Sequence, residues 1–337
     1  MRLRKWTIAG VALLAAAGLT GCGGGSSNSA AAPAPVSQAD LATVTLKVGD
    51  QKGGSKSVLA AANLLADVPY KIEWSTFTSG PPLLEAASAG AIDIGRVGNT
   101  PPIFAAAAKA KIAVVSAARH NVTSDALVVP SDSPLKDVSE LRGKTIAVAK
   151  GSSAHGQILL TLRKAGLSTK DVKLTFLQPS EAYAAFNQHQ VDAWAIWDPY
   201  TSQALLESKA RVLADGTGTA NGYAFQVAGT NALGDAGKNS AIRDFVVRIA
   251  KAEVWADTHR TEWAQAWAKE TALKLEVAQA AVNQGGDLPV ALDDQLVASE
   301  QELADAFTED KTLPGKVDFA KVVDRRFGPD VAAVRSK

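Results

Sequence analysis

The stretch GSSAHG, from Gly151 to Gly156, joins a predicted strand to a predicted helix. Its two glycines have the spacing of a phosphate-binding P-loop, but that loop continues with Lys and then Ser or Thr. Here Gln157 and Ile158 follow, so the segment is a poor site for a nucleoside triphosphate. It still offers a small anion free N–H groups and the positive end of a helix dipole.

Two other turns share this design, Ser79-Gly80-Pro81 and Asn99-Thr100-Pro101. Ser, Asn and Thr are favoured caps, and Pro fits the first helical turn because its missing N–H would have no partner there. One such turn is ordinary helix capping. Three turns that follow successive strands indicate more, because parallel strands place them at one edge of a sheet. We expect an anion site there.

Two neighbouring features add candidate contacts. His155 can add a hydrogen bond or a charge to the anion site, or it can be a surface residue in a first helical turn.

The segment Trp197-Asp198-Pro199-Tyr200 follows a predicted strand, so Trp197 can form an apolar wall of the site. The alternative is that Trp197 and Tyr200 only pack the protein. We interpret Asp198 as a helix cap or hinge partner, because it would repel an anion.

Residues for catalysis or metal binding are scarce. No G-x-S-x-G motif surrounds Ser152 or Ser153, and the four His residues are scattered through the chain. Cys22 is the only cysteine, so the body of the protein has no thiol nucleophile. We predict no catalytic residue, no metal site and no cofactor.

The N-terminus reads as a targeting segment. A basic start and a short apolar run end at Leu19-Thr20-Gly21-Cys22, which resembles a bacterial lipobox, where the Cys becomes the lipid-modified first residue. The alternative is a plain secretory signal. Residues 23–36 are rich in Gly, Ser, Ala and Pro and predict a flexible tether. We therefore expect an exported protein held by lipid at the outer face of the cytoplasmic membrane.

The charge balance excludes some partners. The formal net charge is +1, and it falls to −2 without residues 1–21, which carry three basic residues and no acidic one. A near-neutral body argues against nucleic acid as a partner. An anion must then be bound by local dipoles rather than by global charge.

The order of predicted elements indicates an α/β protein. Strands alternate with helices from residue 44 to residue 129, and the pattern restarts from residue 138. The C-terminal third is helical. There Trp255, Trp263 and Trp267 continue an apolar face, and we interpret them as packing residues.

At these residues the chain resembles the aliphatic sulfonate-binding proteins of ABC importers, in the group that includes taurine-, nitrate- and pyrimidine-precursor-binding proteins. The stretches that carry the resemblance are GDQKG at 49–53, TSGPPLLEA at 78–86, IDIGRVGNTPPIFA at 92–105, ALVVPSDSPLKDVSELRGKTIAV at 126–148, GSSAHG at 151–156 and VDAWAIWDPY at 191–200. They span about residues 46–214 in the right order. The C-terminal third matches in helical character more than in motif.

The resemblance implies a two-lobed, type II periplasmic-binding-protein fold. Each lobe would be a mainly parallel sheet flanked by helices, with the ligand in the cleft between lobes. The implied domains are a signal peptide at 1–21, a tether at 22–43 with lipidated Cys22, lobe one at 44–128 and 227–337, and lobe two at 129–226. The lobes would close on the ligand by a hinge motion.

The resemblance also implies which residues face the ligand: Gln51, Ser79, Gly80, Asn99 and Thr100 from lobe one, and Ser152, Ser153, His155 and Trp197 from lobe two. Backbone N–H groups and hydroxyls would hold the sulfonate, and Trp197 would flank its carbon chain. Family members often have Asp where Asn99 stands, which leaves the organic end of the ligand open.

The implied role is capture of an alkanesulfonate by a monomer and delivery to an ABC permease with its ATPase, for sulfur acquisition. The alternatives are the same role for taurine, nitrate or a pyrimidine precursor, an enzyme on the same fold, or a sensor domain. Fold relatives include a sulfinate desulfinase with a Cys nucleophile, a residue that the body of this chain lacks.

Overall fold

The computed structural model describes residues 32–335. The predicted signal peptide at 1–21, the lipid-modified Cys22 and residues 22–31 of the predicted tether lie outside this range. The described part of that predicted tether contacts the folded body. Ser37 caps the short helix α1 (Gln38–Leu41), Leu41 is buried, and the N–H of Val36 donates to Ser240 Oγ at 3.2 Å. The body therefore begins near residue 36 rather than at residue 44.

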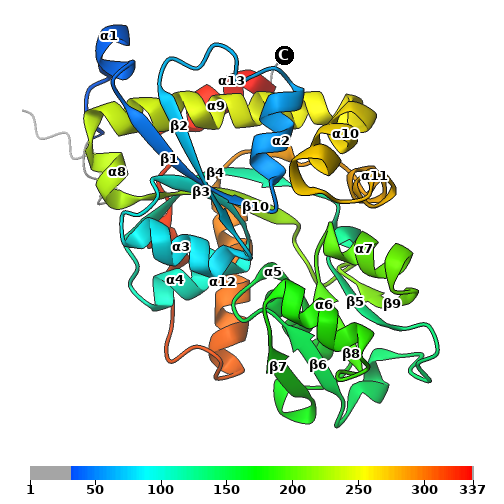
Figure 1. The fold of residues 1–337 in the computed structure, drawn as a ribbon. Coiled ribbons are helices and arrows are strands. Elements are labelled where there is room, and N and C mark those ends of the chain that lie inside the picture. Colours follow the sequence, from blue (N-terminus) through cyan, green and yellow to red (C-terminus); the bar gives the residue numbers. More distant parts are fainter. Residues whose placement is uncertain (1–31, 336–337) are drawn as a thin grey trace, which may run out of the picture. The chain divides into compact units, whose positions relative to one another are not determined.

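The first sheet has six strands in the order β11-β4-β10-β3-β1-β2 (Figure 1). Their bounds are β1 (Thr45–Gln51), β2 (Lys71–Phe77), β3 (Ile94–Gly98), β4 (Ile112–Arg119), β10 (Tyr223–Gly229) and β11 (Leu288–Val290). Strand β1 pairs in parallel with β2 and β3, while β10 runs antiparallel to both β3 and β4. The four strands β1 to β4 consequently point the same way.

The second sheet has five strands in the order β7-β6-β8-β5-β9. Their bounds are β5 (Ala126–Pro130), β6 (Thr145–Val148), β7 (Lys173–Phe176), β8 (Ala193–Ile196) and β9 (Ala210–Asp215). Strand β6 pairs in parallel with β7 and β8, and β5 runs antiparallel to β8 and β9. We call each sheet with its helices a lobe.

The chain crosses from one sheet to the other just before β5 and just before β10, and each of these two strands runs antiparallel to its neighbours. Both sheets are therefore mixed, although most strands in each point one way. The predicted α/β architecture of two helix-flanked sheets is confirmed. The changes of sheet occur at residues 120–125 and 216–222, slightly before the predicted crossings near 129 and 226, because β5 belongs wholly to the second sheet and β10 to the first.

Helices cover both faces of each sheet (Figure 1). The first lobe holds α2 (Gly54–Ala61), α3 (Gly80–Ser88), α4 (Thr100–Ala107), α8 (Thr230–Gly234), α9 (Ala236–Thr258), α10 (Arg260–Thr271), α11 (Leu275–Asn283), α12 (Asp294–Glu309) and α13 (Gly328–Arg335). The second holds α5 (Ser153–Lys164), α6 (Pro179–Asn187) and α7 (Tyr200–Glu207). Short 3₁₀ helices occur at Val122–Ser124, Val138–Leu141, Thr169–Asp171 and Phe319–Val322. Within residues 32–335, no helix has the length and apolar character that crossing a membrane requires.

Alternating strand residues build a hydrophobic cluster on each face of each sheet. In β3, Ile94 packs with the cluster under α9, whereas Val97 packs with the cluster under α3 and α4. Two further clusters, around Ile158 and around Trp194, cover the faces of the second sheet. This two-sided burial holds the carboxyl ends of the strands, and the loops that follow them, in fixed places.

Candidate functional site

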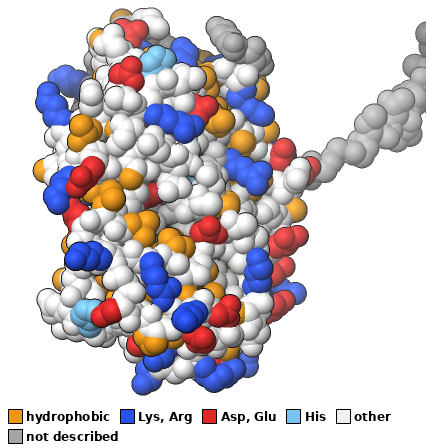
Figure 2. Space-filling model, turned by 90° about the vertical axis from the view of Figure 1, so that its right-hand side faces the viewer, with side chains coloured by type: hydrophobic (Ala, Val, Ile, Leu, Met, Phe, Trp, Pro, Cys, Tyr) orange, Lys and Arg blue, Asp and Glu red, His pale blue; other side chains and the backbone are white. Residues whose placement is uncertain are grey.

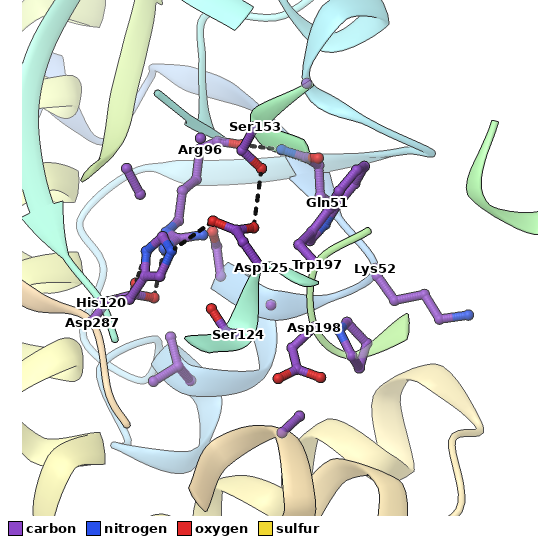
Figure 3. A pocket seen from close by; sticks show the side chains of 18 of the residues that line it. Gln51, Lys52, Arg96, His120, Ser124, Asp125, Ser153, Trp197, Asp198 and Asp287 are labelled. Atoms are coloured by element: carbon purple, nitrogen blue, oxygen red, sulfur yellow. Dashed lines mark hydrogen bonds and ion pairs between the residues drawn. The ribbon is translucent and has the colours of Figure 1, made fainter. Parts of the chain in front are cut away.

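A pocket of about 170 Å³ lies where strand ends of both lobes meet helix starts. Five of the nine predicted site residues line it: Gln51, Gly80, Ser152, Ser153 and Trp197. Figure 3 shows Gln51, Ser153 and Trp197 at one end of this pocket. Residues at the end of β1, directly after β8 and at the starts of α3 and α5 thus border one cavity.

The start of α5 supplies the dipole and N–H groups that the sequence predicted. Gly151 has φ of +74°, a left-handed backbone that glycine adopts without strain. Ser152 is the cap residue, since its Oγ accepts from the N–H of His155 and donates to the carbonyl of Ala149. The hydroxyl of Ser152 is thus used within the turn, and first-turn N–H groups of α5 remain for a ligand.

The start of α3 lies against the start of α4. A Cβ on Gly80 would come within 2.6 Å of the Cγ of Pro101, so only glycine fits this approach. The two lobes also meet closely here, because a Cβ on Gly98 would lie 2.9 Å from the Cβ of Ser153. Small residues at these points let α3, the end of β3 and α5 border one cavity.

Three predicted residues make contacts outside the pocket lining. The Oγ of Ser79, which is buried, donates to Gln178 Oε1 of the other lobe at 2.9 Å. The amide of Asn99 donates to Asn221 Oδ1 at 2.9 Å, and Thr100 donates to Asn99 Oδ1 at 3.0 Å. Asn99 and Thr100 therefore belong to a polar network beside the second crossing.

His155 has a different role from the predicted one. Its ring packs against Phe104, Phe176 and Phe307, with ring centroids 5.1–5.7 Å away, and its Nδ1 accepts from the N–H of Gly151 at 3.1 Å. Burial lowers the pKa of His155 to about 4, so the ring is neutral near pH 7. It does not line the pocket and brings no charge to it.

The pocket lining also holds a charged cluster that no sequence motif indicated, consisting of Arg96, His120, Asp125 and Asp287 (Figure 3). Arg96 pairs with Asp287 at 2.6 Å, and the ring nitrogens of His120 lie 3.5 Å from Asp125 and from Asp287. Burial opposes the charged form of His120, but the two carboxylates outweigh it and raise its pKa to about 9. The cluster holds two positive and two negative charges.

Arg96 and His120 lie near the ends of β3 and β4. This strand-end position is a sequence signal that could have indicated them as site residues. No local signal marks Asp287, which lies 191 positions after Arg96 in the sequence. Their pairing depends on β11 being placed beside β4 by the tertiary fold.

The C-terminal helices close one end of the pocket and contribute two tryptophans to its lining. Trp263 and Trp267 are buried and stacked, with centroids 5.6 Å apart and planes at 8°, and both line the pocket. Trp267 Nε1 donates to the carbonyl of Lys52 at 2.8 Å, while Trp263 Nε1 has no hydrogen-bond partner among residues 32–335. They pack, as predicted, but they also form an aromatic wall.

Asp198 and Glu253 also line the pocket. Asp198 precedes Pro199, the N-cap residue of α7, and its Oδ1 accepts from the N–H of Ser202 in the first turn of that helix at 2.8 Å. Burial raises the pKa of Asp198 to about 6, and burial also raises that of Glu253 well above its usual value. Residues 32–335 contain no group of three or more His, Cys, Asp or Glu side chains suited to a metal ion.

Comparison with known proteins places the chain in a family. Residues 60–266 match the family described as ABC transporter, phosphonate, periplasmic substrate-binding protein. A protein of Escherichia coli (strain K12), named for binding aliphatic sulfonates, is 37% identical over 286 residues, which cover 83% of this chain and 89% of that protein. The chain belongs to the aliphatic sulfonate-binding proteins of ABC transporters. This confirms the resemblance that the sequence motifs indicated.

Solved structures of this family agree with the fold. The alkanesulfonate-binding protein SsuA from Xanthomonas axonopodis pv. citri, bound to MOPS, is 35% identical with a TM-score of 0.78 over 83% of this chain and 98% of its own. The periplasmic aliphatic sulphonate binding protein SsuA from Escherichia coli is 36% identical with a TM-score of 0.73, covering 83% of this chain and 92% of its own. The family's periplasmic-binding-protein fold is therefore the fold of this chain.

Proposed function

We propose that this protein captures aliphatic sulfonates outside the cytoplasm and delivers them to an ABC permease with its ATPase, for sulfur acquisition. The observation that carries the proposal is the pocket between the starts of α3 and α5, in a chain 37% identical to a relative named for these ligands. Helix starts bind a small tetrahedral anion without a lysine. In this proposal, the P-loop-like GSSAHG turn binds the sulfonate group.

The bound sulfonate would accept hydrogen bonds from first-turn N–H groups of α3 and α5. The hydroxyl of Ser153 points to the same end of the cavity and lies 3.5 Å from Asp125 Oδ1 (Figure 3). Gln51 borders this end, and its Nε2 is held by the carbonyl of Arg96 at 2.7 Å. Trp197, which is partly exposed, would cover the carbon chain.

Closure of the two lobes would enclose the ligand. Hydroxyls of Thr78 and Ser79 both donate to Gln178 Oε1 at 2.9 Å, and these contacts join the two lobes at the rim. The domain division predicted from the sequence, with lobe one discontinuous, stays a prediction in this scheme. The two segments that cross between the sheets, residues 120–125 and 216–222, would be the hinge.

Lipid attachment at Cys22 would hold the protein, as a monomer, at the outer face of the cytoplasmic membrane. The lipobox-like sequence before Cys22 supports this part of the proposal. Basic and acidic side chains are both spread over the face shown in Figure 2, so that face does not resemble a nucleic-acid surface.

The same role for taurine, nitrate or a pyrimidine precursor is the alternative within the binding class. An enzymatic role has less support, because the only cysteine is Cys22, outside the described body. Turnover of an aryl sulfinate by the purified protein would establish the enzymatic alternative.

A fluorescence titration separates these alternatives, because Trp197, Trp263 and Trp267 all line the pocket. We expect alkanesulfonates to change the tryptophan emission saturably at micromolar concentration, while sulfate and nitrate leave it unchanged. A response to nitrate or to a pyrimidine precursor, without a response to any sulfonate, would contradict the proposed ligand class.

A further inference from the structure

Glu300 is a fully buried carboxyl group in α12. Its Oε1 accepts from Asn221 Nδ2 at 2.8 Å, and its Oε2 has no hydrogen-bond partner among residues 32–335. The other buried side chains of this helix are apolar, among them Leu296, Leu303 and Phe307. A buried carboxyl group costs free energy that an apolar side chain of similar size does not. What the carboxyl group adds at this position is the bond to Asn221.

Asn221 is a junction in the second crossing between the sheets. Its Oδ1 accepts from Asn99 Nδ2 at 2.9 Å and from the N–H of Tyr223 at 3.2 Å. Its carbonyl accepts from Arg119 Nε at 3.2 Å. Because Glu300 accepts from the amide nitrogen of Asn221, it fixes which way this amide faces and keeps Oδ1 directed toward Asn99.

The network continues from Asn99 to the helix that begins at the proposed sulfonate site. Asn99 is the N-cap residue of α4, and its Oδ1 accepts from the hydroxyl of Thr100 at 3.0 Å. A Cβ on Gly156 would come within 2.4 Å of Thr100 Oγ1, so the first turn of α5 lies directly against this hydroxyl. Figure 1 shows α12 beside α4 and α5. Asn221, Asn99 and Thr100 thus link α12 to the start of α5.

A cavity of about 330 Å³ lies beside this network, between α5, the second crossing and α12. Asn99, Gln157, Asn221 and Ser299 are among the residues that line it. Close packing therefore does not fix the second crossing on this side, whereas protein interiors are normally filled to crystal-like density. The hydrogen bonds of the network consequently carry more of the task of placing the crossing against α5 and α12.

Resting on the function proposed above, we propose that Glu300 is a positioning residue for sulfonate binding. It orients the amide of Asn221, and through Asn221 and Asn99 it holds the second crossing and the start of α5 in the arrangement that binds the ligand. Glu300 does not line the pocket that holds the sulfonate in this proposal. Its loss should therefore weaken sulfonate binding without removing a ligand contact.

The protonation of Glu300 gives this role a measurable signature. Burial raises the pKa of Glu300 to about 8, and the bond from Asn221 lowers it only in part. Near pH 7 the carboxyl group is therefore mostly neutral in the folded protein. Above pH 8 it ionises, and a buried carboxylate with one hydrogen bond favours arrangements of the junction that let water reach it. We therefore expect the sulfonate affinity to fall as the pH rises through 8.

Other charged groups around α12 do not explain such a fall. Helix α4 and the second crossing contain no charged residue. The titratable and charged side chains of α5, β4 and the 3₁₀ helix at 319–322 are engaged elsewhere: His155 with three phenylalanines, Arg163 with Glu309, Lys164 with the carbonyl of Thr217, Arg119 with the carbonyl of Asn221, and Lys321 with Asp318. In the sulfonate pocket, the pKa of His120 is about 9, so only a comparison of variants isolates Glu300.

Two variants at this position separate the hydrogen bond from the charge. Calorimetry with hexanesulfonate, in sulfonate-free buffers between pH 6.5 and pH 8.5, measures the affinity of each purified protein. Glu300→Gln keeps an acceptor for Asn221 and cannot ionise, so we expect near-normal affinity at pH 7 and a smaller fall toward pH 8.5 than in the unaltered protein. Glu300→Leu removes the acceptor, so we expect about tenfold weaker binding at every pH, the factor that an unsatisfied buried donor gives.

The same titrations contain the controls. The binding stoichiometry should stay near one in every variant, which shows that weaker affinity does not come from unfolded protein. Glu302→Gln is the matched control, because it makes the same replacement at an exposed residue of the same helix. Its affinity and its pH profile should equal those of the unaltered protein.

The outcomes keep this proposal separate from the proposed function. Normal sulfonate affinity in Glu300→Leu, or a pH profile in Glu300→Gln equal to that of the unaltered protein, would overturn the positioning role while leaving the sulfonate site in place. An equal change in Glu302→Gln would overturn the assignment to Glu300. Failure of the unaltered protein to bind any alkanesulfonate would overturn the proposed function and the positioning role with it.

Discussion

The imidazole of His155 is enclosed by Phe104, Phe176 and Phe307, and accepts a hydrogen bond from the N–H of Gly151. Its pKa is about 4 because burial penalises the charged form, compared with about 6.5 in an unfolded chain. Above pH 6.5 the ring is neutral in both states and costs nothing. As the pH falls toward 4, the unfolded chain binds a proton that the folded chain excludes, so stability is lost.

We therefore predict that His155 contributes about 3 kcal/mol to the loss of unfolding free energy between pH 7 and pH 4. The variant His155→Gln removes this titration and keeps an acceptor for Gly151. Its stability should fall less over this pH range than that of the unaltered protein, as measured by urea unfolding at several pH values. The control His189→Gln makes the same replacement at an exposed histidine. Equal slopes in all three proteins would contradict a buried, neutral His155.

At the scale of elements, Gln178, the N-cap residue of α6, is one of the side chains that join the two lobes. The residue before that helix, Gln178, accepts from both Thr78 and Ser79 through its Oε1, at 2.9 Å in each case. These bonds span the start of α3 and the start of α6. A hydrogen bond of this kind contributes about 1 kcal/mol.

We predict that Gln178→Ala speeds release of a bound alkanesulfonate by about fivefold, the factor that roughly 1 kcal/mol gives. Stopped-flow measurement of tryptophan emission, with a competing sulfonate in excess, gives this rate. The control Gln188→Ala removes an exposed glutamine of the same lobe that has no contact across the rim. An unchanged release rate in Gln178→Ala would show that these bonds do not hold the lobes together.

The elements were largely predictable because apolar periodicity and capping residues are local signals. The strand predicted before Trp197 and the helix predicted at the GSSAHG stretch are examples, and they correspond to β8 and α5. The crossings were predicted a few residues late, because β5 and β10 look like ordinary strands and only their pairing reveals the sheet to which they belong.

The site was predictable only where it is made of strand ends and helix starts. Ser153 and Trp197 follow from that rule, whereas Gln51 was implied only by the family resemblance. Glu253 and Trp263 do not, because each lies within a helix whose apolar spacing indicates simple packing. The sequence of such a helix does not show whether the helix covers a hydrophobic core or closes a pocket. That depends on the residues against which it packs, which lie 150 or more positions away in the chain.

At the level of the whole molecule, we propose that the N-terminus of the protein attaches the ligand-binding body to the membrane. The sequence before Cys22 supports this, although it lies outside the described residues. One acyl chain gives only marginal membrane binding, so stable anchoring needs the several chains of a lipoprotein modification.

We predict that Cys22→Ser moves the protein from the membrane fraction to the soluble fraction or leaves it unprocessed, and abolishes incorporation of labelled palmitate. Cell fractionation and labelling measure this directly. The neighbouring change Ser26→Ala should alter neither result. Membrane retention and labelling that persist in Cys22→Ser would contradict lipid attachment at this residue.

Calorimetry shows whether the helix starts of α3 and α5 form a sulfonate site. The purified protein, freed of sulfonate buffers, is titrated with ethanesulfonate, longer alkanesulfonates, sulfate and nitrate. We expect micromolar or tighter binding of alkanesulfonates at one site and no binding of sulfate or nitrate. Silence from every alkanesulfonate, with nitrate or a pyrimidine precursor bound instead, would contradict it.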